Sequence, residues 1–143
     1  MANRATAAFV VSIIGAAYQM ISVYAAGLID RNTFLIYYSY GNETLFFTSF
    51  LVIWSASHIL EDWKGRITWP SIIIVIGIAN ISAIIMAYYA QTSVIQIASN
   101  PPSIGSIIAP ITGPLMIILG GLLGFSAVKQ YSREHGHAVL GHA

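Results

Sequence analysis

The sequence predicts an all-α protein, a single domain over residues 1–143 in which four strongly hydrophobic antiparallel helices form a bundle with both termini on the same side. Four long uncharged stretches fill most of the chain, and nearly every charge lies between them or at the two ends. Hydrophobic residues make up 57% of the chain and charged residues only 8%. Soluble domains carry roughly a quarter charged residues, so this composition argues strongly against a water-soluble monomer.

The first helix is expected over residues 5–29. About 25 apolar residues at 1.5 Å rise per residue are long enough to cross a hydrocarbon layer of about 30 Å. The polar run Asp30-Arg31-Asn32 follows and ends the apolar stretch. A length of this kind suits either a lipid environment or burial among other copies of the chain.

The second helix is expected over residues 45–60 and is less regular than the first. Residues 34–40 are apolar and aromatic, so a longer helix that includes residues 34–44 is the alternative. Gly41 and Asn42 in succession favour a break before the helix. A polar connection over residues 61–66 then leads to the next apolar stretch.

The third helix is expected over residues 68–91. Thr68 is a suitable N-cap, and Pro70 is tolerated in the first turn, where backbone donors have no partner within the helix. Ser, Asn, Pro and Gly are frequent in residues 92–113, so we expect irregular backbone there.

The fourth helix is expected over residues 114–133, with Pro114 in its first turn. Residues 134–143 contain two glycines and three histidines and are expected to fray. The spacing of these tail histidines is not that of a rigid metal site, and a solvated tail is the expected interpretation. They are His135, His137 and His142.

Lys and Arg are distributed unequally between the two ends of this bundle. Only Arg31 falls in the connections opposite the termini. By the positive-inside rule, the termini would be cytoplasmic if the helices cross a membrane. The basic residues on the side of the termini are Arg4, Lys64, Arg66, Lys129 and Arg133.

Two N-glycosylation sequons occur in the chain, and the predicted topology places them in different environments. Asn42 lies in a polar segment on the side opposite the termini, so we expect it to be accessible to modification. Asn80 lies in the middle of the third helix and is expected to stay unmodified.

Small residues recur at intervals that allow close helix packing. Glycine and alanine are also common in any apolar helix, which is the alternative explanation. A smaller patch of the same kind lies on the first helix at Ser12, Gly15 and Ala16. The main packing candidates are Gly120 and Gly124 on the fourth helix and Ala79, Ala83 and Ala87 on the third.

Groups that carry catalytic chemistry are missing from the apolar stretches. The acidic residues lie near the ends of these stretches, and no nucleophile–base pair or phosphate-binding loop is recognisable. His58 is the one histidine inside an apolar stretch, and a bis-histidine haem would need a second. We therefore expect a non-enzyme without cofactor or metal, in which His58 is a hydrogen-bonded residue near a helix end.

The chain resembles the major capsid proteins of large tailed spindle-shaped archaeal viruses. The resemblance lies in the start Asn3-Arg4-Ala5-Thr6, the polar connection over residues 61–66, the stretch over residues 113–121 and the short basic tail. It implies a structural coat subunit that packs against many identical copies in a virion shell. Its basic side would face double-stranded DNA and contact the phosphate backbone without reading sequence.

An integral four-span membrane protein, such as an accessory subunit of an archaeal membrane complex, is the alternative. It explains the distribution of basic residues and the aromatic residues near the helix ends equally well. The small-residue faces and the missing ion-binding groups favour the coat subunit. Whether lipid fills the space between subunits is left open by the sequence.

Overall fold

The computed structural model describes residues 2–29, 42–62, 67–95 and 105–134. These residues form four helices and no strand, so the prediction of an all-helical, four-helix fold is confirmed. The helices are α1 (Ala2–Ile29), α3 (Asn42–Asp62), α4 (Thr68–Ile95) and α5 (Gly105–Glu134).

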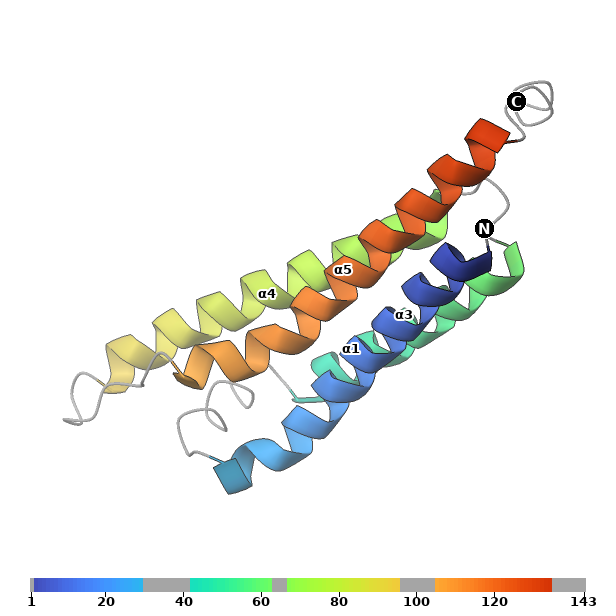
Figure 1. Ribbon diagram of the computed structural model, residues 1–143. Coiled ribbons are helices and arrows are strands. Elements are labelled where there is room, and N and C mark those ends of the chain that lie inside the picture. The colour runs from blue at the N-terminus through green and yellow to red at the C-terminus, as the bar shows by residue number, and fades with distance from the viewer. Residues whose placement is uncertain (1, 30–41, 63–66, 96–104, 135–143) are drawn as a thin grey trace.

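The helices pack around a common axis, with α1 and α4 each lying between α3 and α5 (Figure 1). The most extensive contact joins α1 to α5. Along this contact Gly15 meets Ile117 and Gly120 meets Ser12, so the two helices run in opposite directions. The beginning of α1 and the end of α5 lie at the same end of the bundle (Figure 1).

Each helix is longer than the residue range that the sequence predicted for it. The start of α4 at Thr68 agrees with the predicted range, but the carbonyl oxygen of Ile67 accepts the first backbone hydrogen bond, from the nitrogen of Ser71 at 3.1 Å, so Ile67 and not Thr68 is the N-cap. Helix α3 begins at Asn42, three residues before the expected position. Residues 34–41, where a longer helix was the alternative, lie outside the described residues. The predicted end of the fourth helix agrees within one residue with Glu134, and the tail after it also lies outside.

The expectation of irregular backbone over residues 92–113 is wrong at both ends of that segment. Helix α4 continues to Ile95, and α5 already begins at Gly105. Both prolines of the early part of α5, Pro110 and Pro114, are buried. Turn-forming residues are weak local signals, and packing of this segment against the other helices overrides them.

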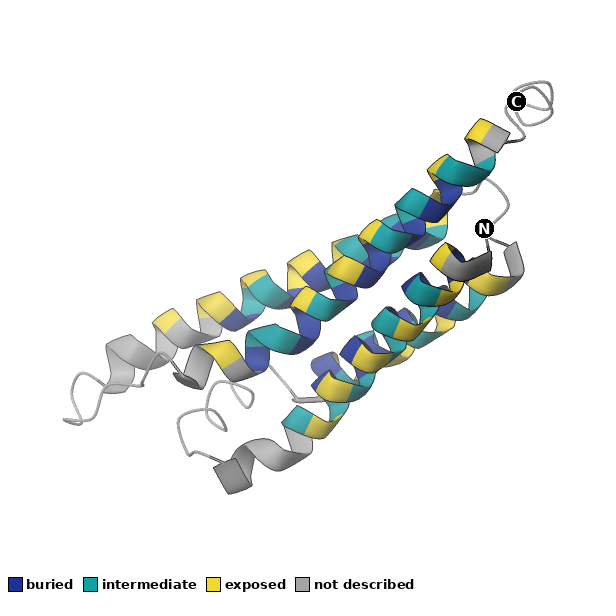
Figure 2. Cartoon of the chain, in the orientation of Figure 1, coloured by how far each residue is buried: buried dark blue, intermediate teal, exposed yellow. Residues whose placement is uncertain are grey.

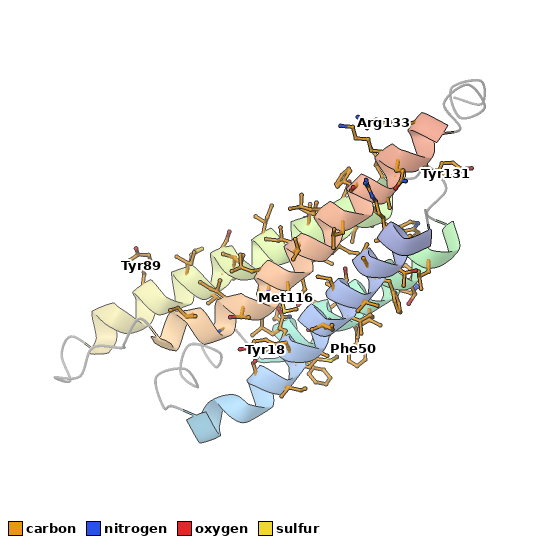
Figure 3. The ribbon with its side chains drawn as sticks, viewed as in Figure 1. Tyr18, Phe50, Tyr89, Met116, Tyr131 and Arg133 are labelled. Carbon is orange, nitrogen blue, oxygen red and sulfur yellow. The ribbon has the colours of Figure 1, made fainter. Side chains whose placement is uncertain are left out.

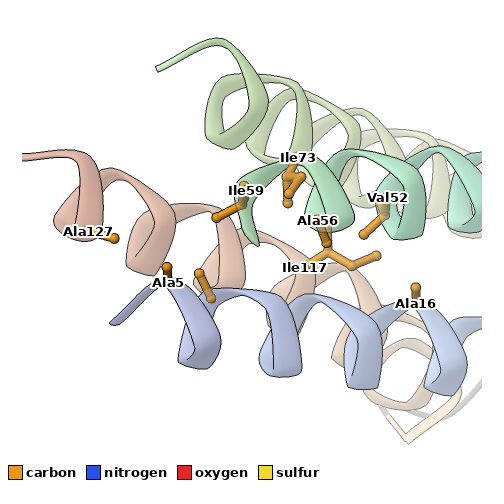
Figure 4. Packing of buried hydrophobic residues seen from close by; sticks show 9 residues of the cluster. Ala5, Ala16, Val52, Ala56, Ile59, Ile73, Ile117 and Ala127 are labelled. Carbon is orange, nitrogen blue, oxygen red and sulfur yellow. The ribbon is translucent and has the colours of Figure 1, made fainter. Parts of the chain in front are cut away.

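Small side chains dominate the centre of the bundle (Figure 4). Alanine and β-branched residues fill it, with no large aromatic ring among the fully buried members. The narrow core lets the helices approach closely. Its members are Ala5, Ala8, Ala16, Val52, Ala56, Ile59, Ile73, Ile117 and Ala127.

Many large apolar side chains are exposed on the outside of the bundle. Figure 2 shows that every helix has exposed residues along its outer side. Met86 is 71% exposed and Ile21 is 66% exposed, values that are uncommon for such residues in a soluble monomer. All four helices contribute, and in Figure 3 the labelled Phe50 and Tyr89 point away from the bundle. A helix that is apolar on every side needs burial by something outside its own bundle.

Glycine is required where the backbones of α1 and α5 meet. A Cβ atom at Gly120 would lie 2.8 Å from the backbone nitrogen of Ser12 and 3.0 Å from its Cα atom. These are backbone atoms, which cannot rotate out of the way. Even one added methyl group at this position therefore forces the two helices apart.

We predict that Gly120→Ala lowers the stability of the folded bundle by about 1–3 kcal/mol, the usual cost of overpacking. The control is Leu122→Ala, since Leu122 is 53% exposed and its truncation leaves no cavity inside the bundle. Thermal unfolding of both variants in the same detergent measures the difference. Equal melting temperatures for wild type and Gly120→Ala would rule out a tight contact at this position.

Candidate functional site

A basic pocket lies at the end of the bundle where α1 begins and α5 ends. Its volume is about 390 Å³. Figure 3 shows the labelled Arg133 near this end of α5. The pocket brings together three of the five basic residues that the sequence placed on the side of the termini. It is lined by Arg4, Ser126, Lys129, Gln130 and Arg133.

One hydrogen bond ties the two helices together inside this pocket. The Nη1 atom of Arg4 donates to the Oγ atom of Ser126 at 2.9 Å. Lys129 and Arg133 are four residues apart on α5 and therefore share a face of the helix. All three cations are exposed. The other two basic residues of the prediction, Lys64 and Arg66, lie outside the described residues.

The outward face of α5 changes from apolar to basic as it approaches the pocket. Residues seven apart on a helix point in nearly the same direction, about 10 Å further along. One such row is Leu115, Leu122 and Lys129, and the row beside it is Leu119, Ser126 and Arg133. The three leucines are about half exposed. The pocket thus lies where an apolar surface gives way to a charged one.

A second polar feature, a buried amide cluster, lies in the interior of the bundle. The Nε2 atom of Gln19 on α1 donates to the carbonyl oxygen of Leu45 at 2.9 Å and to Oγ of Ser49 at 2.8 Å on α3. The Nδ2 atom of Asn80 on α4 donates to Oε1 of Gln19 and to Oγ1 of Thr48, both at 3.2 Å. Three helices therefore meet in one hydrogen-bonded network.

The sequence prediction missed this cluster. It assigned no role to Gln19 and treated Asn80 only as part of a sequon. The available signal was an amide in the apolar middle of each of two helices, because polar side chains inside apolar helices usually face helix interfaces. That signal indicates an interior position but does not say which helices meet there.

His58 lies between two tryptophans near the end of α3. Its ring stacks on Trp69 of α4, with centroids 4.3 Å apart and the planes at 15°. Trp54 contacts the His58 ring edge-to-face at a centroid distance of 5.1 Å. The Nδ1 atom of His58 is buried and has no hydrogen-bond partner among the described residues, so the hydrogen bond expected for this histidine is not seen there. Aromatic packing between α3 and α4 is the role that the contacts indicate.

The predicted packing residues fall into two groups. A Cβ atom at Gly124 would lie 3.0 Å from Cγ of Pro70, so Gly120 and Gly124 both face neighbouring helices of the same chain. Ala79 is exposed on α4, and Ala83 is half-buried. The side chain of Ala87 lies outside the described part. Contacts between glycines of separate subunits therefore have no support from this arrangement.

The structure describes the side chain of only one of the two sequon asparagines, Asn80. Asn42 is the first residue of α3, but its side chain lies outside the described set. Asn80 is 1% exposed and hydrogen-bonded in the amide cluster. A glycan at Asn80 would require opening the bundle, whereas glycosylation of Asn42 stays a prediction.

Among the described residues, no three His, Asp or Glu side chains come together as metal ligands would. The tail residues His135, His137 and His142 lie outside these ranges. No protein-family model, curated protein or solved structure matches the chain. Its function must therefore be argued from the apolar surface, the basic pocket and the amide cluster.

We predict that Asn80→Ala destabilises the bundle by about 1–3 kcal/mol, because it removes a donor from the buried oxygen of Gln19. In a double-mutant cycle with Gln19→Ala, the coupling energy should be about 0.5–3 kcal/mol, as for residues in one network. Ser57→Ala is the control, since among the described residues the Ser57 hydroxyl bonds only to the carbonyl oxygen of Ile53 within its own helix. Additive effects of the Gln19 and Asn80 changes, measured by unfolding in detergent, would exclude a direct interaction.

Proposed function

We propose that the chain is an integral membrane protein with a structural role, whose helices are surrounded by lipid and whose basic pocket lies at one face of the bilayer. The observation that carries the proposal is the set of exposed large apolar side chains on all four helices, which on α5 gives way to Lys129 and Arg133. Lipid buries such a surface on every helix at once. The basic residues then lie in the headgroup layer, where lysine and arginine side chains are favourable.

Helix lengths support this proposal. Arg4–Ser22 of α1, Thr68–Met86 of α4 and Pro110–Tyr131 of α5 are long and apolar enough to cross a membrane. The corresponding apolar stretch of α3, Thr44–Leu60, is shorter. At 1.5 Å per residue it spans about 25 Å, which is close to the hydrocarbon thickness of about 30 Å.

The position of polar side chains inside the bundle also supports the proposed membrane location. The amide cluster is enclosed by the bundle, as expected for polar groups in a protein whose outside is lipid. Gly120 and Gly124 contact other helices of the same chain. They therefore give no reason to prefer assembly of separate subunits over insertion in lipid. By the positive-inside rule, the pocket end would face the cytoplasm.

Spin labels test the proposal directly, because the chain has no native cysteine. Nitroxides are attached to Ile78→Cys and Leu119→Cys, at exposed apolar positions, and to Lys129→Cys in the pocket. In reconstituted membranes we expect the first two labels to collide with dissolved oxygen and the third with a water-soluble nickel chelate.

Shielding of Ile78→Cys and Leu119→Cys from both reagents would contradict burial by lipid. It would instead indicate that neighbouring protein covers these faces. The same result together with filaments or shells formed without detergent would support the coat subunit.

The coat subunit that encloses DNA is the second candidate, and the grouping of Arg4, Lys129 and Arg133 in one pocket favours it. Three cations close together suit the phosphate backbone of a duplex. In this arrangement the apolar faces would be buried by many copies of the same chain. The side of Asn42 would face outward.

For this candidate we predict salt-dependent DNA binding that the triple variant Arg4→Gln/Lys129→Gln/Arg133→Gln weakens. The slope of log affinity against log salt should fall by about 0.9 for each phosphate that the variant no longer neutralises. Particle formation should persist, because the apolar helices are unchanged. Equal DNA affinity of the variant and wild type across salt concentrations would count against a DNA-facing pocket.

A further inference from the structure

We propose that the basic pocket binds the phosphate of an anionic phospholipid whose acyl chains lie along the leucine face of α5. The ligand class is thus a phosphate ester joined to an apolar tail. The inference rests on the proposed membrane location and adds a specific lipid site to it. Two adjoining surfaces carry it, one charged and one apolar.

Charge defines the first surface. Arg4, Lys129 and Arg133 contribute three cations, and none of the side chains that line the pocket is acidic. The hydrogen bond from Arg4 to Ser126 holds the guanidinium of α1 against α5 at 2.9 Å. A guanidinium has five N–H donors, so this bond leaves others for a phosphate oxygen. The pocket volume of about 390 Å³ accommodates a headgroup rather than a bare ion.

The leucine face defines the second surface. Leu122 precedes Lys129 by seven residues on the same side of α5, and Leu119 stands in the same relation to Ser126. Both leucines are about half exposed. An acyl chain that descends from a phosphate in the pocket therefore meets apolar side chains at once. A free phosphate or a DNA duplex would use the cations but leave these leucines uncovered.

The anionic character of the lipid follows from the balance of charge. A zwitterionic headgroup brings its own cation close to three protein cations, whereas an anionic headgroup does not. Each lysine or arginine near an anionic membrane surface strengthens binding about fivefold. The three cations together should therefore give a clear preference for phosphatidylglycerol over phosphatidylcholine.

The experiment uses the full chain in nanodiscs made from phosphatidylcholine with a minor fraction of phosphatidylglycerol. Lipids that remain bound after transfer to a neutral detergent are identified by native mass spectrometry. We expect retained phosphatidylglycerol on wild type, and a loss of about fivefold in retention for each cation removed from the pocket. The variants are Arg4→Gln, Lys129→Gln and Arg133→Gln, singly and together.

One variant separates the possible phosphate sources, and two further variants are controls for charge. Leu119→Ser/Leu122→Ser should reduce phospholipid retention while leaving any binding of inorganic phosphate unchanged, because only the lipid contacts the leucine face. Arg31→Gln removes a positive charge from a connection predicted at the opposite end of the bundle and should leave retention unchanged. Arg133→Lys keeps the charge and should retain most of the lipid.

Several results would overturn the inference. They are equal retention of the two lipids, unchanged retention by the triple variant, or full displacement of phosphatidylglycerol by a short DNA duplex. Insertion into nanodiscs without a preference for phosphatidylglycerol would reject the lipid site and leave the membrane location standing. Failure to enter nanodiscs, with filaments formed instead, would reject the membrane location itself.

Discussion

Close approach of α1 and α5 is the constraint on which the rest of the structure depends. Helices that are apolar on every side gain little from contact with one another when lipid surrounds them, since lipid tails are equally apolar. Dispersion across a tight interface then has to supply much of the attraction, and this requires small residues. Gly15 and Gly120 provide such contacts between α1 and α5, while Gly77 and Gly121 provide them between α4 and α5. Helix α5 is therefore the element against which α1 and α4 are both positioned.

The amide cluster complements this packing in a different way. Apolar helices can slide or rotate past each other at small cost, but a buried amide is satisfied only in one alignment. Gln19 contacts α3 and α4 at once, and thereby fixes the positions of three helices relative to each other. Glycine contacts set how close the helices come, and the amides set their alignment. The basic pocket depends on both, because Arg4 reaches Ser126 only when α1 and α5 keep this register.

Much of the fold was predictable because long uncharged stretches have few alternatives to helices. The start of α4 at Thr68 was predictable from the polar connection over residues 61–66 that precedes the apolar stretch, although Ile67 rather than Thr68 takes the capping position. The segment before Pro114 was predicted wrongly, since local turn signals do not include the packing that buries Pro110. The sequence predicted that Arg4, Lys129 and Arg133 lie on the same side of the bundle, but it did not predict that they line one pocket. The amide cluster was not anticipated, because Gln19 and Asn80 are 61 residues apart and no local pattern links them.

The interior position of the α3 hydroxyls has a consequence for biogenesis. The apolar stretch of α3 is shorter than those of the other helices and contains Thr48, Ser49 and Ser55, of which Ser49 and Ser55 are buried in the bundle. If the chain is a membrane protein as proposed and α3 left the translocation channel alone, Thr48 and Ser49 would face hydrocarbon without the contacts that Asn80 and Gln19 provide in the bundle. We therefore expect α3 to remain beside α1 and to enter lipid together with α4, so that Thr48 of α3 is already hydrogen-bonded to Asn80 of α4. The order of synthesis suits this route, since α1 precedes α3 and α4 follows it at once.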